Sequence, residues 1–339
     1  MSITFETHVD QIRKVDPKRN YWFLRTYGGQ TFEDFYNKEY VGIGFNNVPF
    51  EYLGKAKSGN VSDIDRIKQF LFSNYNIEGG ENTKWTNQLL EFQHILSIGD
   101  LIVIPSKNSD LLAIGEIISD VFVTKDSRTF LHDGKYEPYP EKRRKVRWIS
   151  SKSKYDLKTE AGDFFLPRTA LTNINTYSEL IEGQVSSLYI KDNKTYLVIQ
   201  IKQDSEINAF HFSRFLDNLT YFYLEFCKEN GYEPNEELYL KIKMQSKGLM
   251  ALAAFVAAGM LGLALLVVLS NDTTFKLDMG DGRKLEGHSE GFVKTLSDFL
   301  DRDQERKIRF EKFRDSMDYL RTQRLEEASI EKKTPNQIK

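Results

Sequence analysis

The chain has 339 residues, of which 40% are hydrophobic and 28% charged; this composition is ordinary for a globular protein and excludes wholesale disorder. Lys and Arg (47) nearly balance Asp and Glu (49), so the formal net charge of −2 gives no general attraction to polyanions. Any polyanion must therefore bind a local patch. The single cysteine, Cys227, excludes a disulfide framework and any multi-cysteine metal site.

The first 150 residues predict a small, strand-rich module. Residues 1–19 are polar and predict a peripheral extension. Beyond them, short apolar runs predict strands, and apolar residues at helical spacing predict two helices. The strands are expected at 21–25, 40–45, 99–105, 112–118 and 145–149, and the helices at 62–76 and 83–96. With two helical insertions, this strand-rich order favours a partly closed barrel over 20–150.

A mixed α/β middle domain is expected at 165–247. Apolar runs at 187–190 and 195–202 flank Asp192-Asn193, a pair typical of hairpin turns. A long helix is expected at 207–230, where the apolar stripe indicates a core or a subunit contact.

An apolar segment at 249–269 contains no polar side chain. As a helix it spans about 31 Å, close to the thickness of a bilayer core, so it predicts a transmembrane helix. Ala254, Ala258 and Gly262 recur every four residues, a spacing that lets membrane helices pack closely. A helix buried in a large soluble core or oligomer is the alternative. In a competing topology, strands at 237–244 and 274–279 pair on one side of the membrane.

The predicted topology is single-pass in the cell inner membrane. The 248 residues before the apolar segment carry no export signal and are expected in the cytoplasm. The C-terminal region, 271–339, is expected across the membrane and to contain an amphipathic helix from 289 to about 328. The fold class expected overall is α+β: a barrel module, a middle domain, one membrane helix and a helical tail.

A run of cations at 142–147 is the most polarised stretch of the chain. In a strand, Arg143, Lys145 and Arg147 point to one side and could bind phosphates. Lys107 and Arg128, on nearby loops, could join them. A solvated edge strand blunted by charge is the alternative.

Several short motifs occur in a characteristic order. They are Trp22…Arg25, Phe35, Val41-Gly42-Ile43-Gly44-Phe45, Gly99-Asp100…Val103…Pro105, Gly115-Glu116-Ile117 and Arg144-Lys145-Val146-Arg147-Trp148. In this order they resemble the PUA/EVE-like module at the N-terminus of Mrr-type restriction and related bacterial defence proteins, over about 20–150. The resemblance implies binding of nucleic acid or a modified base, with Arg25 at the site and with Trp22, Phe45 and Trp148 as candidates for base stacking. Hydrophobic core is the alternative for each tryptophan.

No catalytic residue, metal or cofactor is predicted. Gln200-Ile201-Lys202 matches part of an Mrr-like nuclease strand, but the expected aspartate before it is absent, with Ser187 near its place. Without paired carboxylates, a metal ion lacks its clamp. The chain also lacks a P-loop, GxSxG, HExxH and a dinucleotide-binding glycine loop.

These features together predict an oligomeric membrane effector of bacterial antiviral defence. Its pore would be gated by a nucleotide or short single-stranded oligonucleotide. The architecture resembles Hailong-type systems, which implies a partner nucleotidyltransferase acting through its product. The alternatives are a membrane-anchored nucleic-acid-binding protein without channel activity, and a soluble Mrr-like nuclease-related or interaction protein.

Overall fold

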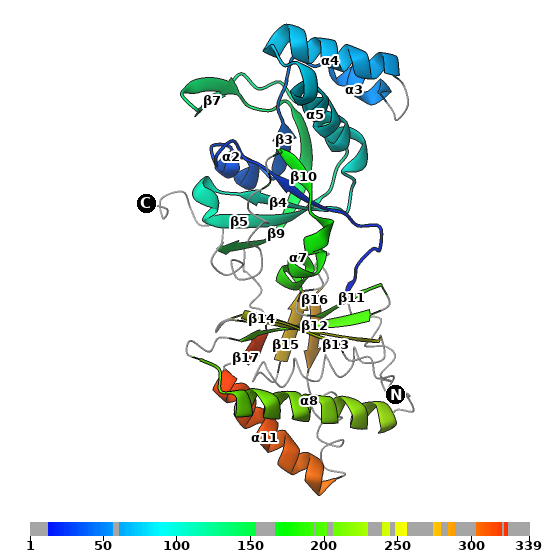
Figure 1. Ribbon diagram of the computed structural model, residues 1–339, viewed down its shortest axis with the longest axis vertical. Coiled ribbons are helices and arrows are strands. Elements are labelled where there is room, and N and C mark those ends of the chain that lie inside the picture. Colours follow the sequence, from blue (N-terminus) through cyan, green and yellow to red (C-terminus); the bar gives the residue numbers. More distant parts are fainter. Residues whose placement is uncertain are drawn as a thin grey trace. The chain divides into compact units, whose positions relative to one another are not determined.

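A computed structural model (Figure 1) describes most of the N-terminal half of the chain and separate segments of the rest. The described residues are 13–56, 61–153, 167, 169–186, 188–192, 194–201, 206–229, 239–244, 248–255, 274–278, 284–288, 303–320 and 322–324. They form two compact units, one of residues 18–179 and one of residues up to 17 and from 180 onward. Both units combine helices with strands, so the expected α+β class is confirmed.

The first unit, residues 18–179, is built on a curled, half-barrel sheet. In sheet order its strands are β10 (Leu171–Asn173), β2 (Tyr21–Leu24), β4 (Leu101–Pro105), β5 (Leu111–Ile117), β9 (Lys142–Ser153) and β3 (Tyr40–Ile43), with β6 (Phe122–Val123) also paired to β9. The pairs are antiparallel except for β2 with β4. β2, β3 and β4 are buried at every residue, which agrees with their continuous apolar sequences. The five strands predicted for this unit are confirmed.

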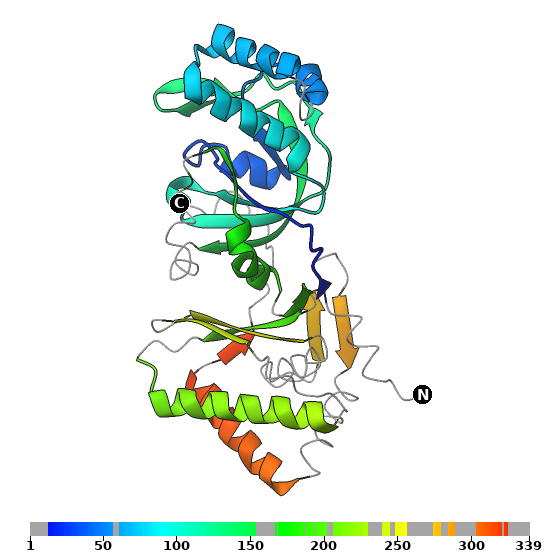
Figure 2. The ribbon, with the colours of Figure 1, turned by 45° about the vertical axis from the view of Figure 1, so that its right-hand side comes forward.

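Helices of the first unit lie beside this sheet. They are α2 (Phe32–Asn37), α3 (Phe50–Lys55), α4 (Val61–Tyr75) and α5 (Gly79–Leu90), and α5 continues into a π-helical turn, η1 (Glu91–Ile95). Figures 1 and 2 show α3, α4 and α5 grouped at one end of the unit. The helices predicted at 62–76 and 83–96 are confirmed. Buried Arg144 secures the π-helical turn, since its guanidinium donates to the carbonyl oxygens of Phe92 and Gln93, each at 3.0 Å.

A two-stranded ribbon projects from the first unit. It consists of β7 (Thr129–His132) and β8 (Lys135–Pro138), which pair only with each other among the described strands. Its turn contains Asp133 and Gly134, both with positive φ, as an Asp-Gly hairpin turn requires. Two small 3₁₀ turns, η2 (Lys107–Ser109) and η3 (Asn175–Tyr177), complete the unit.

A second sheet organises the other unit. Its order is β1 (Arg13–Lys14), β11 (Leu188–Lys191), β12 (Lys194–Ile201), β14 (Gly248–Phe255) and β13 (Tyr239–Met244), with β17 (Thr322–Arg324) beside the end of β12. β15 (Thr274–Asp278) and β16 (Lys284–His288) form a separate pair. The helices are α8 (Ala209–Glu229), α11 (Gln304–Leu320) and most of α7 (Ser178–Val185). The predicted hairpin and long helix are confirmed as β11–β12 and α8. α8 packs on α11 through stacked rings of Phe215 and Phe313, 5.1 Å apart.

The transmembrane-helix prediction is wrong. Residues 249–255 belong to strand β14, which is hydrogen-bonded to β12 on one side and β13 on the other. None of the helices in the described part of the chain combines the length and apolar character that a membrane crossing requires. Of the predicted helix-packing residues, Ala254 pairs with Thr195 of β12, whereas Ala258 and Gly262 lie outside the described residues. A short continuous apolar run is compatible with a strand inside a sheet as well as with part of a membrane helix, and periodicity alone does not distinguish the two.

Three smaller predictions also differ from the structure. Arg13–Lys14 is not peripheral: it pairs in parallel with β11, and buried Arg13 forms an ion pair with Glu182 of α7. The helix expected to reach about 328 ends at Leu320, and residues 289–302 lie outside the described part. The two strands of the competing topology, β13 and β15, do not pair with each other.

Candidate functional site

Two aromatic residues with left-handed backbone meet at Gly44 in the first unit. Tyr27 has φ 53° and Phe45 has φ 59°, a conformation that is an outlier for bulky side chains and costs about 1–3 kcal/mol. A Cβ atom on Gly44 would lie 2.5 Å from the Tyr27 hydroxyl oxygen. The glycine therefore makes room for Tyr27. Such strained residues concentrate at binding and catalytic sites.

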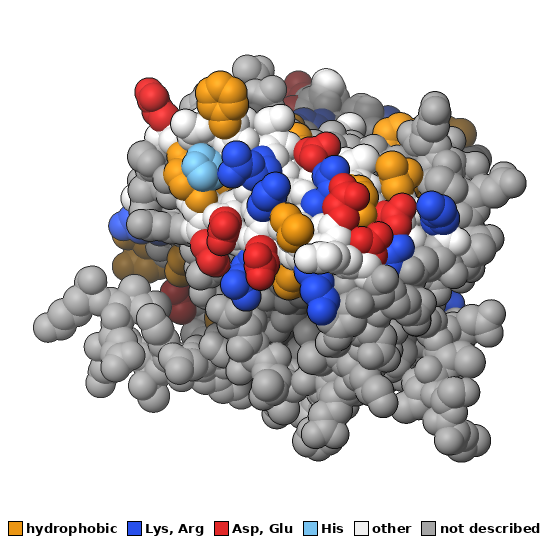
Figure 3. Space-filling model, turned by 90° about the horizontal axis from the view of Figure 1, so that it is seen from below, with side chains coloured by type: hydrophobic (Ala, Val, Ile, Leu, Met, Phe, Trp, Pro, Cys, Tyr) orange, Lys and Arg blue, Asp and Glu red, His pale blue; other side chains and the backbone are white. Residues whose placement is uncertain are grey.

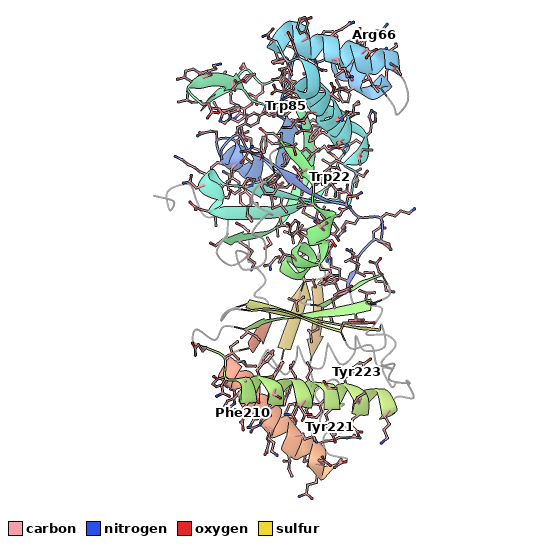
Figure 4. All side chains as sticks on the ribbon, in the orientation of Figure 1. Trp22, Arg66, Trp85, Phe210, Tyr221 and Tyr223 are labelled. Atoms are coloured by element: carbon pink, nitrogen blue, oxygen red, sulfur yellow. The ribbon has the colours of Figure 1, made fainter. Side chains whose placement is uncertain are left out.

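Phe45 is the centre of a group of half-buried rings. Its ring centroid lies 4.9 Å from that of Tyr75, the last residue of α4, and 4.8 Å from that of Trp85 on α5, both in edge-on geometry. Figure 4 labels Trp85 on α5. Tyr27, Phe45, Tyr75 and Trp85 are all partly exposed, and we call these four residues the aromatic cluster. Partly exposed rings of this kind can stack against a planar ligand.

A buried lysine holds the turn that carries Phe45. The Nζ of Lys142 donates to the carbonyl oxygens of Phe45 at 2.7 Å and Asn46 at 3.5 Å. Burial lowers the pKa of Lys142 to about 8. The Asn46 side chain donates to the Tyr139 carbonyl and accepts from the Glu141 N–H, each at 3.0 Å. The Phe45 turn is thereby joined to the chain that follows the ribbon.

The β7–β8 ribbon covers Tyr27. The Tyr27 ring centroid lies 5.0 Å from that of Phe130 and 5.6 Å from that of His132. At the base of the ribbon, Arg128 donates to both carboxylate oxygens of Asp34, at 2.6 and 3.2 Å, and to Asp126. Side-chain contacts and ion pairs therefore hold the ribbon against the cluster.

The predicted phosphate ligands do not form one open patch. Arg143 is buried; it donates to the Pro140 carbonyl and to Asp126, and its guanidinium lies over the Tyr40 ring. Lys145 and Arg147 are exposed, and Arg147 donates to Glu116 at 2.8 Å. Arg128 is paired with Asp34 and Asp126 as described above, while Arg25 and Lys107 are exposed.

The three predicted stacking residues occupy different environments. Trp22 is 2% exposed, and its indole nitrogen donates to Asp100. Trp148 is 7% exposed and packs on Tyr36 over the space left by Gly115. Only Phe45 of the three belongs to the aromatic cluster. Tyr27, Tyr75 and Trp85 were not predicted, although Tyr27, directly before Gly28-Gly29, lies at a turn signal that could have drawn attention to it.

The second unit presents a different surface. The outward face of α8 and α11 mixes basic, acidic and apolar side chains (Figure 3), and part of its charge is paired, as between Arg309 and Asp217 at 3.1 Å.

Gln200 of the nuclease-like motif lies on β12, whereas Lys202 is outside the described residues. In the described part of the chain, no three His, Cys, Asp or Glu residues are grouped as a metal site would require.

Comparison with known proteins adds one family. A family model described as "Domain of unknown function (DUF8426)" matches residues 24–175. The match covers less than half of the chain and corresponds closely to the first unit. No curated protein matches the chain. The chain is therefore similar to a family of unknown function over the unit that carries the aromatic cluster.

Proposed function

We propose that the first unit binds a nucleobase by stacking it in the aromatic cluster, as part of a nucleotide or a short single-stranded oligonucleotide. The observation that carries the proposal is Phe45: a bulky, partly buried residue in a strained backbone conformation, with Tyr75 and Trp85 edge-on to its ring. Stacking of a base on an aromatic side chain contributes about 1–3 kcal/mol. The resemblance to PUA/EVE-like modules supports the same function.

In this proposal the phosphate groups of the ligand are bound by exposed lysine and arginine side chains. Arg25, Lys107 and Lys145 are exposed, and the Nζ of exposed Lys84 lies 6.0 Å from the Trp85 ring centroid. Arg128 and Arg143 already have carboxylate partners in Asp34 and Asp126, so a phosphate would have to displace those partners.

The proposal is limited to ligand binding and does not include a pore. A pore required an apolar helix over 249–269, and strand β14 accounts for residues 249–255. The binding proposal, in contrast, depends on Phe45 and its neighbours, which all belong to the first unit.

Isothermal titration calorimetry of the full chain with mononucleotides and short single-stranded DNA tests the proposal. Phe45→Ala should weaken binding about 5-fold to 150-fold, since about 1–3 kcal/mol of stacking is lost. Phe72→Ala removes a half-exposed ring of α4 that lies outside the aromatic cluster, and should bind as the wild type does. Equal affinity of Phe45→Ala and wild type, or no binding of any nucleotide by the wild type, would overturn the proposal.

A further inference from the structure

We propose that Glu137 selects the ligand, by accepting hydrogen bonds from a base that carries an exocyclic amino group: cytosine, adenine or guanine rather than uracil. The inference rests on the proposed function and names the ligand class for the same site.

Strand register places Glu137 on the ribbon face that meets the aromatic cluster. Phe130 is directly opposite Glu137 in the β7–β8 pair, so both side chains leave the same face. Phe130 packs its ring on Tyr27. The other face carries the pair Leu131 and Tyr136, which are 52% and 76% exposed. Glu137 therefore shares its face with the contact to Tyr27.

Electrostatics agree with this position. Burial raises the pKa of Tyr27, and the negative charge of Glu137 raises it further. The pKa of Tyr75 is also raised, first by burial and then, in part, by the charges of Glu137 and Glu141. A carboxylate that acts on both tyrosines lies close to two members of the aromatic cluster.

The side chain of Glu137 differs from its neighbours among the described residues. Glu137 is half-buried, and no described group donates a hydrogen bond to its carboxylate or forms an ion pair with it. Neighbouring carboxylates differ: Glu141 pairs with Lys125 at 3.3 Å, and Asp34 and Asp126 both bind Arg128. An ionised carboxylate can only accept hydrogen bonds. The Glu137 carboxylate can therefore accept a hydrogen bond from a ligand N–H group beside the aromatic cluster.

The edges of the bases differ in what they offer such an acceptor. Cytosine and adenine present an amino group, and guanine presents an amino group next to a ring N–H. Uracil has one ring N–H between two carbonyl oxygens, and these oxygens repel a carboxylate. The aromatic cluster can stack any base, because every base has a π face. Discrimination between the bases therefore depends on Glu137.

The test compares CMP, AMP, GMP and UMP by isothermal titration calorimetry on the full chain. The wild type should bind the three amino-bearing nucleotides at least tenfold more tightly than UMP. In Glu137→Gln the amide can both donate and accept, so UMP binding should improve and the ratio should fall towards one. Glu141→Gln removes a nearby carboxylate that already has a partner, and should keep the wild-type ratio. Melting temperatures check that both variants are folded.

The outcomes separate this inference from the proposed function. If Phe45→Ala weakens all four nucleotides while Glu137→Gln leaves the ratio unchanged, Glu137 is not the selector and the stacking site stands. Wild-type protein that binds UMP as tightly as CMP likewise excludes Glu137 as the selector. Binding of none of the four overturns both proposals.

Discussion

The indole nitrogen of Trp22 donates a 3.0 Å hydrogen bond to Oδ2 of Asp100. The same carboxylate accepts the backbone N–H groups of Asn20 and Ser97, each at 2.9 Å. Asp100 itself is 3% exposed. The Trp22 and Gly99-Asp100 motifs, which support the resemblance to a base-binding module, therefore act together inside the core and join the start of β2 to the turn before β4.

Asp100→Ala should destabilise the protein strongly, because three buried or partly buried donors lose their acceptor. Each donor left unpaired costs about 1–3 kcal/mol, so we expect a loss of at least about 2 kcal/mol in the free energy of unfolding measured with urea. Asp65→Ala, at an exposed position on α4, is the control and should change stability by less than about 0.5 kcal/mol. A change as small as that of the control would mean that Asp100 is dispensable.

Gly44→Ala should damage the aromatic cluster. The new Cβ would lie 2.5 Å from the Tyr27 hydroxyl oxygen, so Tyr27 must move, and nucleotide affinity should fall at least tenfold. Gly54→Ala adds a Cβ with no heavy atom within 4 Å and lies within α3, where alanine is favoured over glycine by up to about 1 kcal/mol. It should keep full binding and be slightly more stable. If Gly44→Ala binds nucleotides as tightly as the wild type, the position of Tyr27 does not matter for binding, and Tyr27 is not part of the site.

Asp34 should make stability depend on pH in the acid range. Burial opposes ionisation of Asp34, but hydrogen bonds from Arg128, Lys38 and Tyr40 outweigh it and lower its pKa to about 2. As pH falls below about 4, the unfolded chain binds a proton that the folded protein does not, so stability present above that pH is lost. Unfolding followed from about pH 5 to about pH 2.5 should show a shallower decline in Asp34→Asn than in wild type. Glu33→Gln, an exposed neighbour on α2, should keep the wild-type slope.

Lys142 should also make stability rise with pH, but in the alkaline range and because burial disfavours its charged form. Its folded pKa of about 8 lies below the unfolded value of about 10.4. Between these values the unfolded state binds the additional proton, so stability rises with pH. Relative to Lys142→Met, which cannot titrate here, the wild type should gain on the order of 3 kcal/mol between about pH 7 and about pH 10. Urea unfolding of both proteins at several pH values measures this difference, and a constant difference would contradict it.

Local sequence patterns were sufficient for most strands and helices of the first unit. The apolar run at 101–105 and the helical spacing in 61–75 each specify one element, because burial imposes that pattern on neighbouring residues. The binding candidate was harder to predict. Phe45, Tyr75 and Trp85 come from three separate elements, and their contacts depend on how α4 and α5 pack beside β3. No spacing in the sequence encodes that packing.

The cations of β9 are a second case in which the local sequence does not predict the contacts of a side chain. Alternation along a strand places Arg143 on the side of Lys145 and Arg147, and the two latter residues are exposed. Arg143 is nevertheless buried, because Tyr40 and Asp126 cover its guanidinium. Asp126 lies seventeen positions earlier in the chain, so the sequence of β9 contains no sign of this contact.

Leu252→Pro distinguishes a strand from a helix at the apolar segment. The backbone of Leu252 pairs with Leu197 of β12 and with Leu240 of β13, and proline in a central strand removes a ladder hydrogen bond. We expect loss of cooperative unfolding of the second unit and fast hydrogen exchange of the amides from 249 to 255. Leu252→Val, which suits a strand, should keep both properties. A membrane helix often tolerates proline, so native-like exchange in Leu252→Pro would contradict the strand.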